Sequence, residues 1–169
     1  MIFTIGHSTR SLDEFVTLLR AHGIRRVMDV RSIPRSRHNP QLNRETLSRS
    51  LRNRRIAYRH VKALGGLRHP RADSPNTGWR NASFRGFADH MQTPEFEKGL
   101  TGLIRIADDR PTAVICAEAV PWRCHRSLIA DALGVRGVAI RHIQSRSAAR
   151  AHSLTDMAHV RGTQVTYPA

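Results

Sequence analysis

Residues 2–30, IFTIGHSTRSLDEFVTLLRAHGIRRVMDV, decide the fold of this chain. The apolar and β-branched run at 2–5 predicts a short strand that stops at a polar turn. Ser11 and Glu14 stand three residues apart, which is typical of a capping box, and the helix that follows ends at a glycine. Residues 27–30 predict a second strand. A strand, a helix and a strand in this order indicate a right-handed crossover onto a parallel sheet.

The same order of elements returns in the second half of the chain. The pattern predicts further strands at 56–61, 112–116 and 138–143, a helix at 44–55, one or two helices at 84–108 that break near Pro94, and a helix at 127–133 that Gly134 stops. Repeated strand-helix-strand units are typical of α/β folds. We therefore predict a three-layer α/β sandwich, in which helices flank a mostly parallel central sheet.

The length of 169 residues fits one α/β domain that spans 1–169. The tail at 145–169 is weakly patterned, and it is expected to be a short helix or coil with an edge strand at 163–167. Residues 64–82 are rich in Gly, Pro, Asn and Arg. A connection of this length predicts a functional or mobile loop.

The composition is strongly basic. There are 28 Lys and Arg residues against 13 Asp and Glu, a net charge of +15, and 26 of the 28 are arginines. Many of these arginines follow the second predicted strand, at positions 35, 37, 44, 49, 52, 54, 55 and 59. This charge argues against acidic-surface functions and favours a partner that carries phosphate, either a small molecule or a nucleic acid.

The chain has no apolar run near the ~20 residues that span a bilayer, and its first residues do not resemble a secretion signal. We expect a cytoplasmic protein that does not bind a membrane. Its two cysteines, Cys116 and Cys124, would then be free thiols rather than a structural disulfide. The alternative for both is an ordinary buried role, as a small apolar strand residue and as a core thiol.

Ligands of parallel sheets bind at the carboxyl ends of the strands, so the loops that follow the strands predict the site. Three such loops are rich in polar side chains: His7, Ser8, Thr9 and Arg10; Asp29, Arg31, Ser32, Arg35 and Ser36; and Cys116, Glu118, Arg123, Cys124, His125 and Arg126. We expect these loops to meet at one edge of the sheet.

Cys124 is expected to open a helix, whose N-terminus would lower the pKa of its thiol. A phosphatase loop, with Cys and Arg six positions apart, is disfavoured because Trp122 stands at that distance from Cys116. Zinc is a further alternative, but the eight-residue spacing of the cysteines is not that of paired zinc ligands. We therefore expect no metal and no cofactor.

Four motifs together resemble the bacterial and archaeal family called domain of unknown function 488. They are GHSTR at 6–10, DVR at 29–31, LGG at 64–66, and CAE at 116–118 with CHR at 124–126, and the resemblance covers about residues 2–143. It implies a compact α/β fold with a polar pocket built from these motifs, and it implies no reaction. His90 departs from the aromatic residue expected in the central helix.

Two functions fit these residues. The first is an enzyme that acts on a phosphate-bearing, nucleotide or nucleic-acid substrate. In it, Cys124 or Cys116 is the nucleophile, His7 or His125 moves a proton, Glu118 orients a base, and Asp29 is a further catalytic candidate or an ion-pair partner of Arg31. The anion would be bound by Ser8, Thr9, Arg10, Arg31, Ser36, Arg123 and Arg126. The alternative is a module that binds nucleic acid or a small anion without chemistry.

Overall fold

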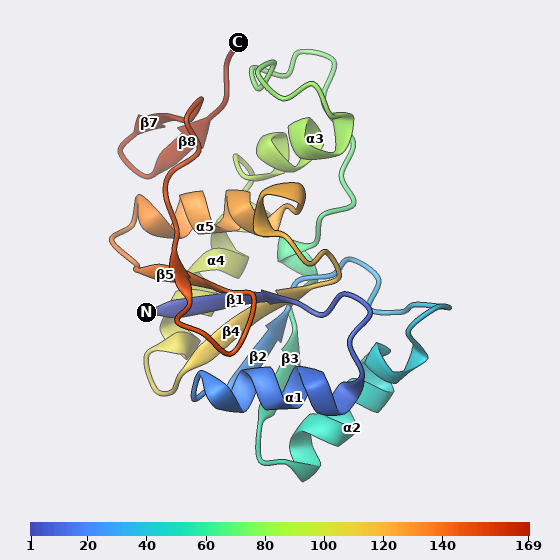
Figure 1. The fold of residues 1–169 in the computed structure, drawn as a ribbon. Coiled ribbons are helices and arrows are strands. Elements are labelled where there is room, and N and C mark those ends of the chain that lie inside the picture. Colours follow the sequence, from blue (N-terminus) through green and yellow to red (C-terminus); the bar gives the residue numbers. More distant parts are fainter.

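A six-stranded sheet, with the strand order β3-β2-β4-β1-β5-β6, forms the centre of the protein (Figure 1). The computed structural model describes residues 1–169. The strands are β1 (Ile2–Gly6), β2 (Arg26–Asp29), β3 (Ala57–His60), β4 (Thr112–Cys116), β5 (Ile140–Ile143) and β6 (Arg150–Ala151). Strands β1 to β5 are parallel, and β6 pairs antiparallel with β5. The prediction of a mostly parallel sheet is confirmed.

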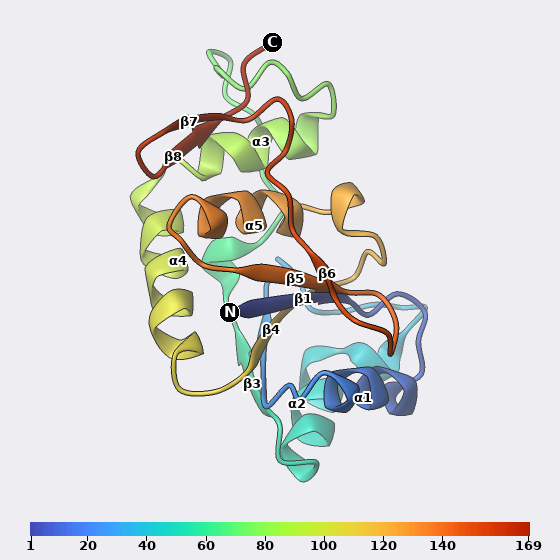
Figure 2. The same ribbon diagram turned by 60° about the vertical axis from the view of Figure 1, so that its left-hand side comes forward.

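Helices cover both faces of this sheet, which confirms the three-layer sandwich. Helices α1 (Leu12–Ala21) and α2 (Arg44–Asn53) lie on one face, and α3 (Ala82–His90), α4 (Pro94–Ala107) and α5 (Arg126–Gly134) lie on the other (Figure 2). Two apolar clusters, of 15 and 21 buried residues, fill the two spaces between the layers. No helix has both the length and the apolar character that a membrane crossing requires.

Local sequence signals explain most of these elements. All five residues of β4 are buried, as expected for a parallel strand that is covered on both faces. The side chain of Ser11 accepts a hydrogen bond from the backbone N–H of Glu14 at 3.1 Å, which caps α1. Thr93 caps α4 in the same way and Pro94 occupies its first turn, so the chain breaks between α3 and α4 at the predicted place.

The long loop at 64–82 contains no helix or strand beyond the end of a short 3-10 turn at Lys62–Leu64. It is fastened to α3 by the carboxylate of Asp89, which accepts hydrogen bonds from Arg71 N at 2.8 Å, Ser74 Oγ at 2.6 Å and Asn76 Nδ2 at 2.7 Å. The conformation of the loop is thus held by these polar contacts together with apolar packing of Trp79, whose ring stacks on Phe84 at a centroid distance of 4.7 Å.

Of the two forms expected for the carboxyl-terminal tail, a short helix or coil, the structure has coil with short strands and no helix. Besides β6, the tail forms a hairpin of β7 (His159–Arg161) and β8 (Gln164–Thr166), joined through Gly162 in a left-handed conformation. The edge strand expected at 163–167 is β8, and it pairs with β7 rather than with the central sheet. Tyr167 anchors the end of the tail, because its hydroxyl donates to Asp131 Oδ2 at 2.8 Å.

Candidate functional site

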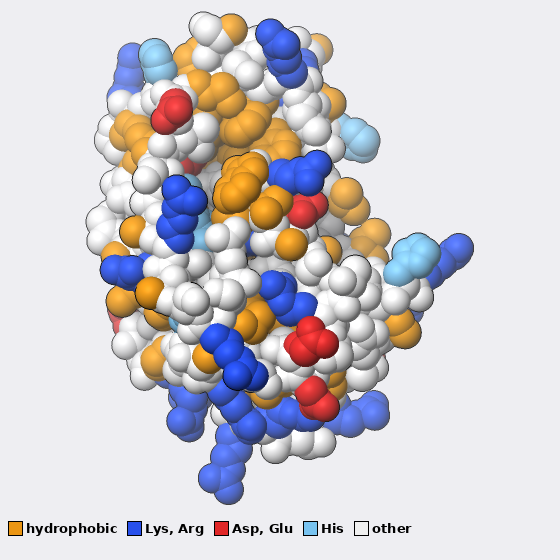
Figure 3. Space-filling view, viewed as in Figure 1, with side chains coloured by type: hydrophobic (Ala, Val, Ile, Leu, Met, Phe, Trp, Pro, Cys, Tyr) orange, Lys and Arg blue, Asp and Glu red, His pale blue; other side chains and the backbone are white.

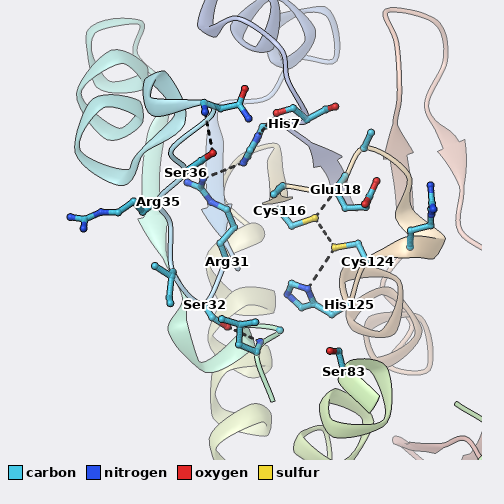
Figure 4. Close-up of a pocket in the computed structure, with 18 of the residues that line it drawn as sticks. His7, Arg31, Ser32, Arg35, Ser36, Ser83, Cys116, Glu118, Cys124 and His125 are labelled. Carbon is cyan, nitrogen blue, oxygen red and sulfur yellow. Dashed lines mark hydrogen bonds between the residues drawn. The ribbon is translucent and has the colours of Figure 1, made fainter. Parts of the chain in front are cut away.

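A cavity of about 680 Å³ opens at the carboxyl ends of β1, β2 and β4 (Figure 4). Ten of the sequence-predicted site residues line it: His7, Ser8, Thr9, Arg31, Ser36, Cys116, Glu118, Arg123, Cys124 and His125. Ser32, Arg35, Asn39, Leu67, Ser83 and Phe84 also line it and were not among the predicted site residues. Ser32 and Arg35 belong to a loop that the strand ends indicated, whereas Ser83 and Phe84 come from α3 and carry no local signal.

Two glycines let the loops around the cavity approach closely. A Cβ atom at Gly6 would overlap the carbonyl group of Glu118, and one at Gly66 would lie 2.5 Å from His125 Nδ1. Beyond Gly6, the N–H of His7 donates to Cys116 O and the N–H of Ser8 to Ala117 O, each at 2.9 Å. The pairing of β1 with β4 therefore continues into the loops, which places the backbone of His7 next to the backbone of Cys116.

The two cysteines lie against each other and against a buried arginine. Cys116 Sγ is 2.6 Å from Cys124 Sγ and 2.6 Å from Arg126 Nη1. The same guanidinium donates to the carbonyl oxygens of Glu118 and Ala119, so the loop wraps around it. Burial alone would raise the pKa of the Cys116 thiol, but the Cys124 hydrogen bond and the Arg126 charge lower it to about 7.

Cys124 has the opposite protonation tendency. The hydrogen bond to Cys116, burial and the neighbouring thiolate raise the pKa of the Cys124 thiol well above its ordinary value. Cys124 has extended backbone and precedes α5 by two residues, and the pKa-lowering hydrogen bond from the Arg126 N–H, at 3.5 Å, is weaker than the effect of the other thiol. Of the two nucleophile candidates, Cys116 is the one that the Arg126 guanidinium contacts, and this contact favours its thiolate.

His125 is a neutral imidazole next to the cysteine pair. Its Nε2–H donates to Val30 O at 3.0 Å, which leaves the Nδ1 lone pair 3.6 Å from Cys124 Sγ. The ring packs edge-on against Phe87, with 4.9 Å between the ring centroids. Burial lowers the pKa of His125 to about 4, so the ring is uncharged at neutral pH.

His7 and Arg31 form the wall of the cavity opposite the cysteines (Figure 4). His7 Nδ1–H donates to Ser8 O at 2.8 Å, and His7 Nε2 accepts from Arg31 Nη1 at 3.2 Å. Burial lowers the pKa of His7, which keeps it neutral. Asp29 is fully buried behind this wall and accepts hydrogen bonds from Arg31, the shortest of them Nη2 to Oδ2 at 2.6 Å and Nε to Oδ1 at 2.9 Å. Asp29 therefore positions Arg31 and does not face the cavity.

Of the four predicted anion-binding arginines, Arg31 and Arg123 line the cavity and Arg10 and Arg126 do not. Arg10 does not line the cavity: its guanidinium donates to Gly6 O and, at 3.2 Å, to Gln144 O. Arg126 lies beneath Cys116 and acts on the thiol. Arg35 and Arg123 lie on the cavity rim, and their side chains make no hydrogen bond or ion pair. The side chain of Arg35 extends away from Cys116 (Figure 4). These two remain free to bind a ligand.

Other polar groups of the cavity are held in part by the backbone. Ser8 has a left-handed conformation with φ of 50°, which is uncommon for a residue other than glycine and occurs often at functional sites. Ser36 Oγ accepts from Asn39 N at 3.1 Å, and Glu118, which is exposed, accepts from Val120 N at 3.5 Å.

The structure brings no three His, Cys, Asp or Glu side chains into an arrangement that could hold a metal ion.

A family model described as domain of unknown function DUF488 matches residues 11–133, which is more than half of the chain. The chain belongs to this family. The resemblance seen in the sequence motifs is thereby confirmed, and the matched range includes both cysteines, Asp29 and Arg126, whereas His7 precedes it. Searches of the curated proteins and of the solved structures give no match. The family description names no activity, so function is argued from the geometry of the cavity.

Proposed function

We propose that this protein is an enzyme in which the thiolate of Cys116 attacks an electrophilic atom of a phosphate-bearing substrate. A bond forms between Cys116 Sγ and that atom, the bond from that atom to a leaving group breaks, and the leaving group takes up a proton. The observation that carries the proposal is the position of Cys116 Sγ, which faces the cavity and lies 2.6 Å from both Arg126 Nη1 and Cys124 Sγ. Thiolates are the nucleophilic form of cysteine. The Cys124 hydrogen bond and the Arg126 charge lower the pKa of the Cys116 thiol to about 7, which favours this form near neutral pH.

A binding module would not need this arrangement. Arg126 is 1 % exposed, and burying a cation is costly unless a negative charge lies beside it. No carboxylate pairs with Arg126, so the thiolate of Cys116 is the partner that balances its charge. Activating a cysteine nucleophile with an adjacent positive charge is a common device of covalent catalysis.

The charges around the cavity favour an anionic substrate. Its lining includes Arg31, Arg35 and Arg123 but only one carboxylate, that of Glu118. The charge of Arg31 is balanced by Asp29, whereas Arg35 and Arg123 have no acidic partner. Arginine binds phosphate well because its planar guanidinium donates two parallel hydrogen bonds. Hydroxyl groups of Ser8, Thr9 and Ser83 supply further donors on the lining.

The two histidines supply sites for a proton in this mechanism. Both are neutral at pH 7, because burial lowers the pKa of each ring. His7 lies on the cavity wall, and its Nε2 contact with Arg31 is the longer of its two hydrogen bonds, at 3.2 Å against 2.8 Å. We assign His7 as the group that exchanges a proton with the substrate, and His125 as the acceptor that faces Cys124.

The proposal is tested with reduced full-length protein and a panel of nucleotides and sugar phosphates. Conversion is followed by phosphorus NMR, and acid-quenched samples are analysed by mass spectrometry for an adduct on Cys116. We expect at least one compound to be converted, and Cys116→Ser to reduce its conversion by about 100-fold or more. Arg123→Gln should raise KM, whereas Arg161→Gln, on an exposed strand remote from the cavity, should not. Unchanged conversion by Cys116→Ser would refute the nucleophile.

A nucleic-acid partner is the second candidate, and one observation favours it. Lys and Arg side chains gather at the lower end of the molecule, over α1 and α2 (Figure 3). Six exposed arginines of α2, the adjoining loops and β3 have no ion-pair partner: Arg37, Arg44, Arg49, Arg52, Arg55 and Arg59. If they contact phosphates, the affinity for a short DNA or RNA duplex should fall steeply between about 50 and 200 mM salt. Fluorescence anisotropy that shows salt-independent binding, or none, would exclude this partner.

A further inference from the structure

We propose that Cys116 and Cys124 form a reversible redox pair: a hydroperoxide oxidises Cys116, and Cys124 then closes an intramolecular disulfide that blocks the nucleophile. This inference concerns the two thiols alone and holds whether or not the protein acts on a phosphate-bearing substrate. It differs from a structural disulfide, because the bond would form in the folded protein in response to an oxidant and would be removed by a thiol reductant.

The distance between the sulfurs is the first support. The two Sγ atoms are 2.6 Å apart, and a disulfide bond is about 2.05 Å long, so the sulfurs need to move together by only about 0.5 Å. Both cysteines are unpaired thiols. They belong to different segments, because Cys116 ends β4 whereas Cys124 follows the 3-10 turn at Pro121–Arg123. The fold, and not proximity in the chain, brings them into contact.

The cavity gives a small oxidant access to the pair. Cys116 and Cys124 both line it, although their residues are only 2 % and 6 % exposed. A hydroperoxide is small enough to enter a cavity of this size, whereas a folded protein disulfide is not.

The two thiols have the unequal acidities that such a pair requires. The low pKa of Cys116 provides the thiolate that attacks a peroxide, and the raised pKa of Cys124 keeps the second thiol protonated until it is needed. The imidazole of His125 offers its Nδ1 lone pair at 3.6 Å from Cys124 Sγ. The order of attack is therefore fixed by the environment, with Cys116 first and Cys124 second.

The chemistry balances in two steps. In the first, the Cys116 thiolate attacks the terminal oxygen of the hydroperoxide, and the O–O bond breaks. Cys116 becomes a sulfenic acid and loses two electrons, while the peroxide gains them and leaves as an alcohol or water after taking up a proton. In the second, Cys124 gives up its proton and attacks Cys116 Sγ, so that the S–S bond forms and the S–O bond breaks. The departing hydroxide takes that proton and leaves as water.

Mass spectrometry of the full chain tests the pair without any substrate. Reduced protein treated with one equivalent of hydrogen peroxide should lose two hydrogens, yield a peptide linked through Cys116 and Cys124, and regain its original mass with dithiothreitol. In Cys124→Ser, the sulfenic acid should persist and be trapped by dimedone on Cys116. In Cys116→Ser, neither product should form.

Two results would overturn the redox pair. One is wild-type protein in which peroxide carries Cys116 to sulfinic acid without any disulfide. The other is wild-type protein that keeps both thiols free, with no dimedone adduct in Cys124→Ser. Because no phosphate compound is present, failure here leaves the proposed enzyme activity standing. Conversely, a disulfide that forms in a protein that converts no phosphate compound would refute only the proposed activity.

Discussion

The environment of Arg126 favours ionisation of the Cys116 thiol that it contacts. Its guanidinium meets one sulfur atom and two carbonyl oxygens, and none of these groups carries a charge while the thiol is protonated. Ionisation of Cys116 therefore creates an anion that compensates the buried positive charge of Arg126. The same guanidinium therefore holds the loop carbonyls and lowers the pKa of the Cys116 thiol.

Asp29 gives a stability prediction for the opposite wall of the cavity. Its carboxylate accepts hydrogen bonds from the backbone N–H and the guanidinium of buried Arg31 and one from the hydroxyl of Tyr58 at 2.6 Å. Asp29→Asn leaves the Arg31 cation without a counter-charge and should lower the free energy of unfolding by about 3–5 kcal/mol. Tyr58→Phe removes one hydrogen bond to a charged group and should cost about 1.5–3 kcal/mol. Urea unfolding measures both, and equal small losses would show that Asp29 does not balance Arg31.

His90 shows how an imidazole fits a position where the sequence analysis expected an aromatic residue. Its ring packs against Phe87 and Phe96 at centroid distances of 5.9 and 5.8 Å, and its Nε2–H donates to Ala63 O at 2.6 Å. Burial lowers the pKa of His90 and keeps the ring neutral. The imidazole therefore takes the place of an aromatic ring and also satisfies a backbone carbonyl.

The junction between β1 and the loop after β4 is the element on which the cavity depends most. At Gly6, a Cβ atom would overlap the Glu118 carbonyl that Arg126 also contacts. Gly6→Ala should therefore lower the free energy of unfolding by about 1–3 kcal/mol and slow alkylation of Cys116. Gly102→Ala in α4 is the matched control, because a Cβ atom at Gly102 would have no neighbouring atom within 4 Å. This variant should stabilise the protein by about 0.5–1 kcal/mol. Thermal unfolding that ranks the two variants equally would contradict the close approach.

Elements built on local signals could be predicted from the sequence. The apolar runs of β1, β2 and β4 and the cap at Ser11 depend on neighbours in the chain, and all were placed correctly. The hairpin of the tail was missed because β7 is exposed along its length and carries no apolar alternation. Where the sequence pattern is this weak, the pairing of β7 with β8 depends on tertiary contacts, such as that of Tyr167 with Asp131.

The candidate site was predictable in place but not in chemistry. The rule that ligands bind at the carboxyl ends of parallel strands brought ten residues to one cavity. The choice of nucleophile depended on contacts that no spacing reveals. Proximity to a helix start favoured Cys124, whereas the guanidinium of Arg126 lies on Cys116, ten positions earlier in the chain. Arg10 was misplaced for the same reason, because its partners are backbone carbonyls of β1 and of the segment after β5.

The buried histidines make the stability of the protein depend on pH. Burial lowers the pKa of His125 and of His142 to about 4, whereas an unfolded chain keeps values near 6.5. Between these values the unfolded state binds more protons, so stability is complete above pH 6.5 and is lost as the pH falls toward 4. Each fully buried histidine contributes a slope of at most about 1.4 kcal/mol per pH unit.

Urea unfolding at pH 7, 6 and 5 measures this dependence. The free energy of unfolding should decrease steadily over the series, and His142→Gln should give a shallower decrease than the wild type. A free energy that is constant or rises toward pH 5 would mean that these rings are already charged in the folded protein.

The arginines behind the net charge of +15 lie in three different environments. Arg31 and Arg126 are buried and organise the cavity, Arg35 and Arg123 are free at its rim, and the exposed arginines of α2 face solvent. Net charge alone therefore does not distinguish a small phosphate-bearing substrate from a nucleic acid. The reactivity of a single thiol makes that distinction more directly, because binding of nucleic acid to α2 requires no thiolate.

The pH dependence of Cys116 alkylation is the most direct test. Reduced protein is labelled with limiting iodoacetamide at a series of pH values, and the rate at each cysteine is read by peptide mass spectrometry. We expect the Cys116 rate to reach half of its maximum near pH 7 and to exceed that of Cys124 throughout. Half-maximal labelling of Cys116 near pH 9, or faster labelling of Cys124, would contradict the assignment of Cys116 as the thiolate nucleophile.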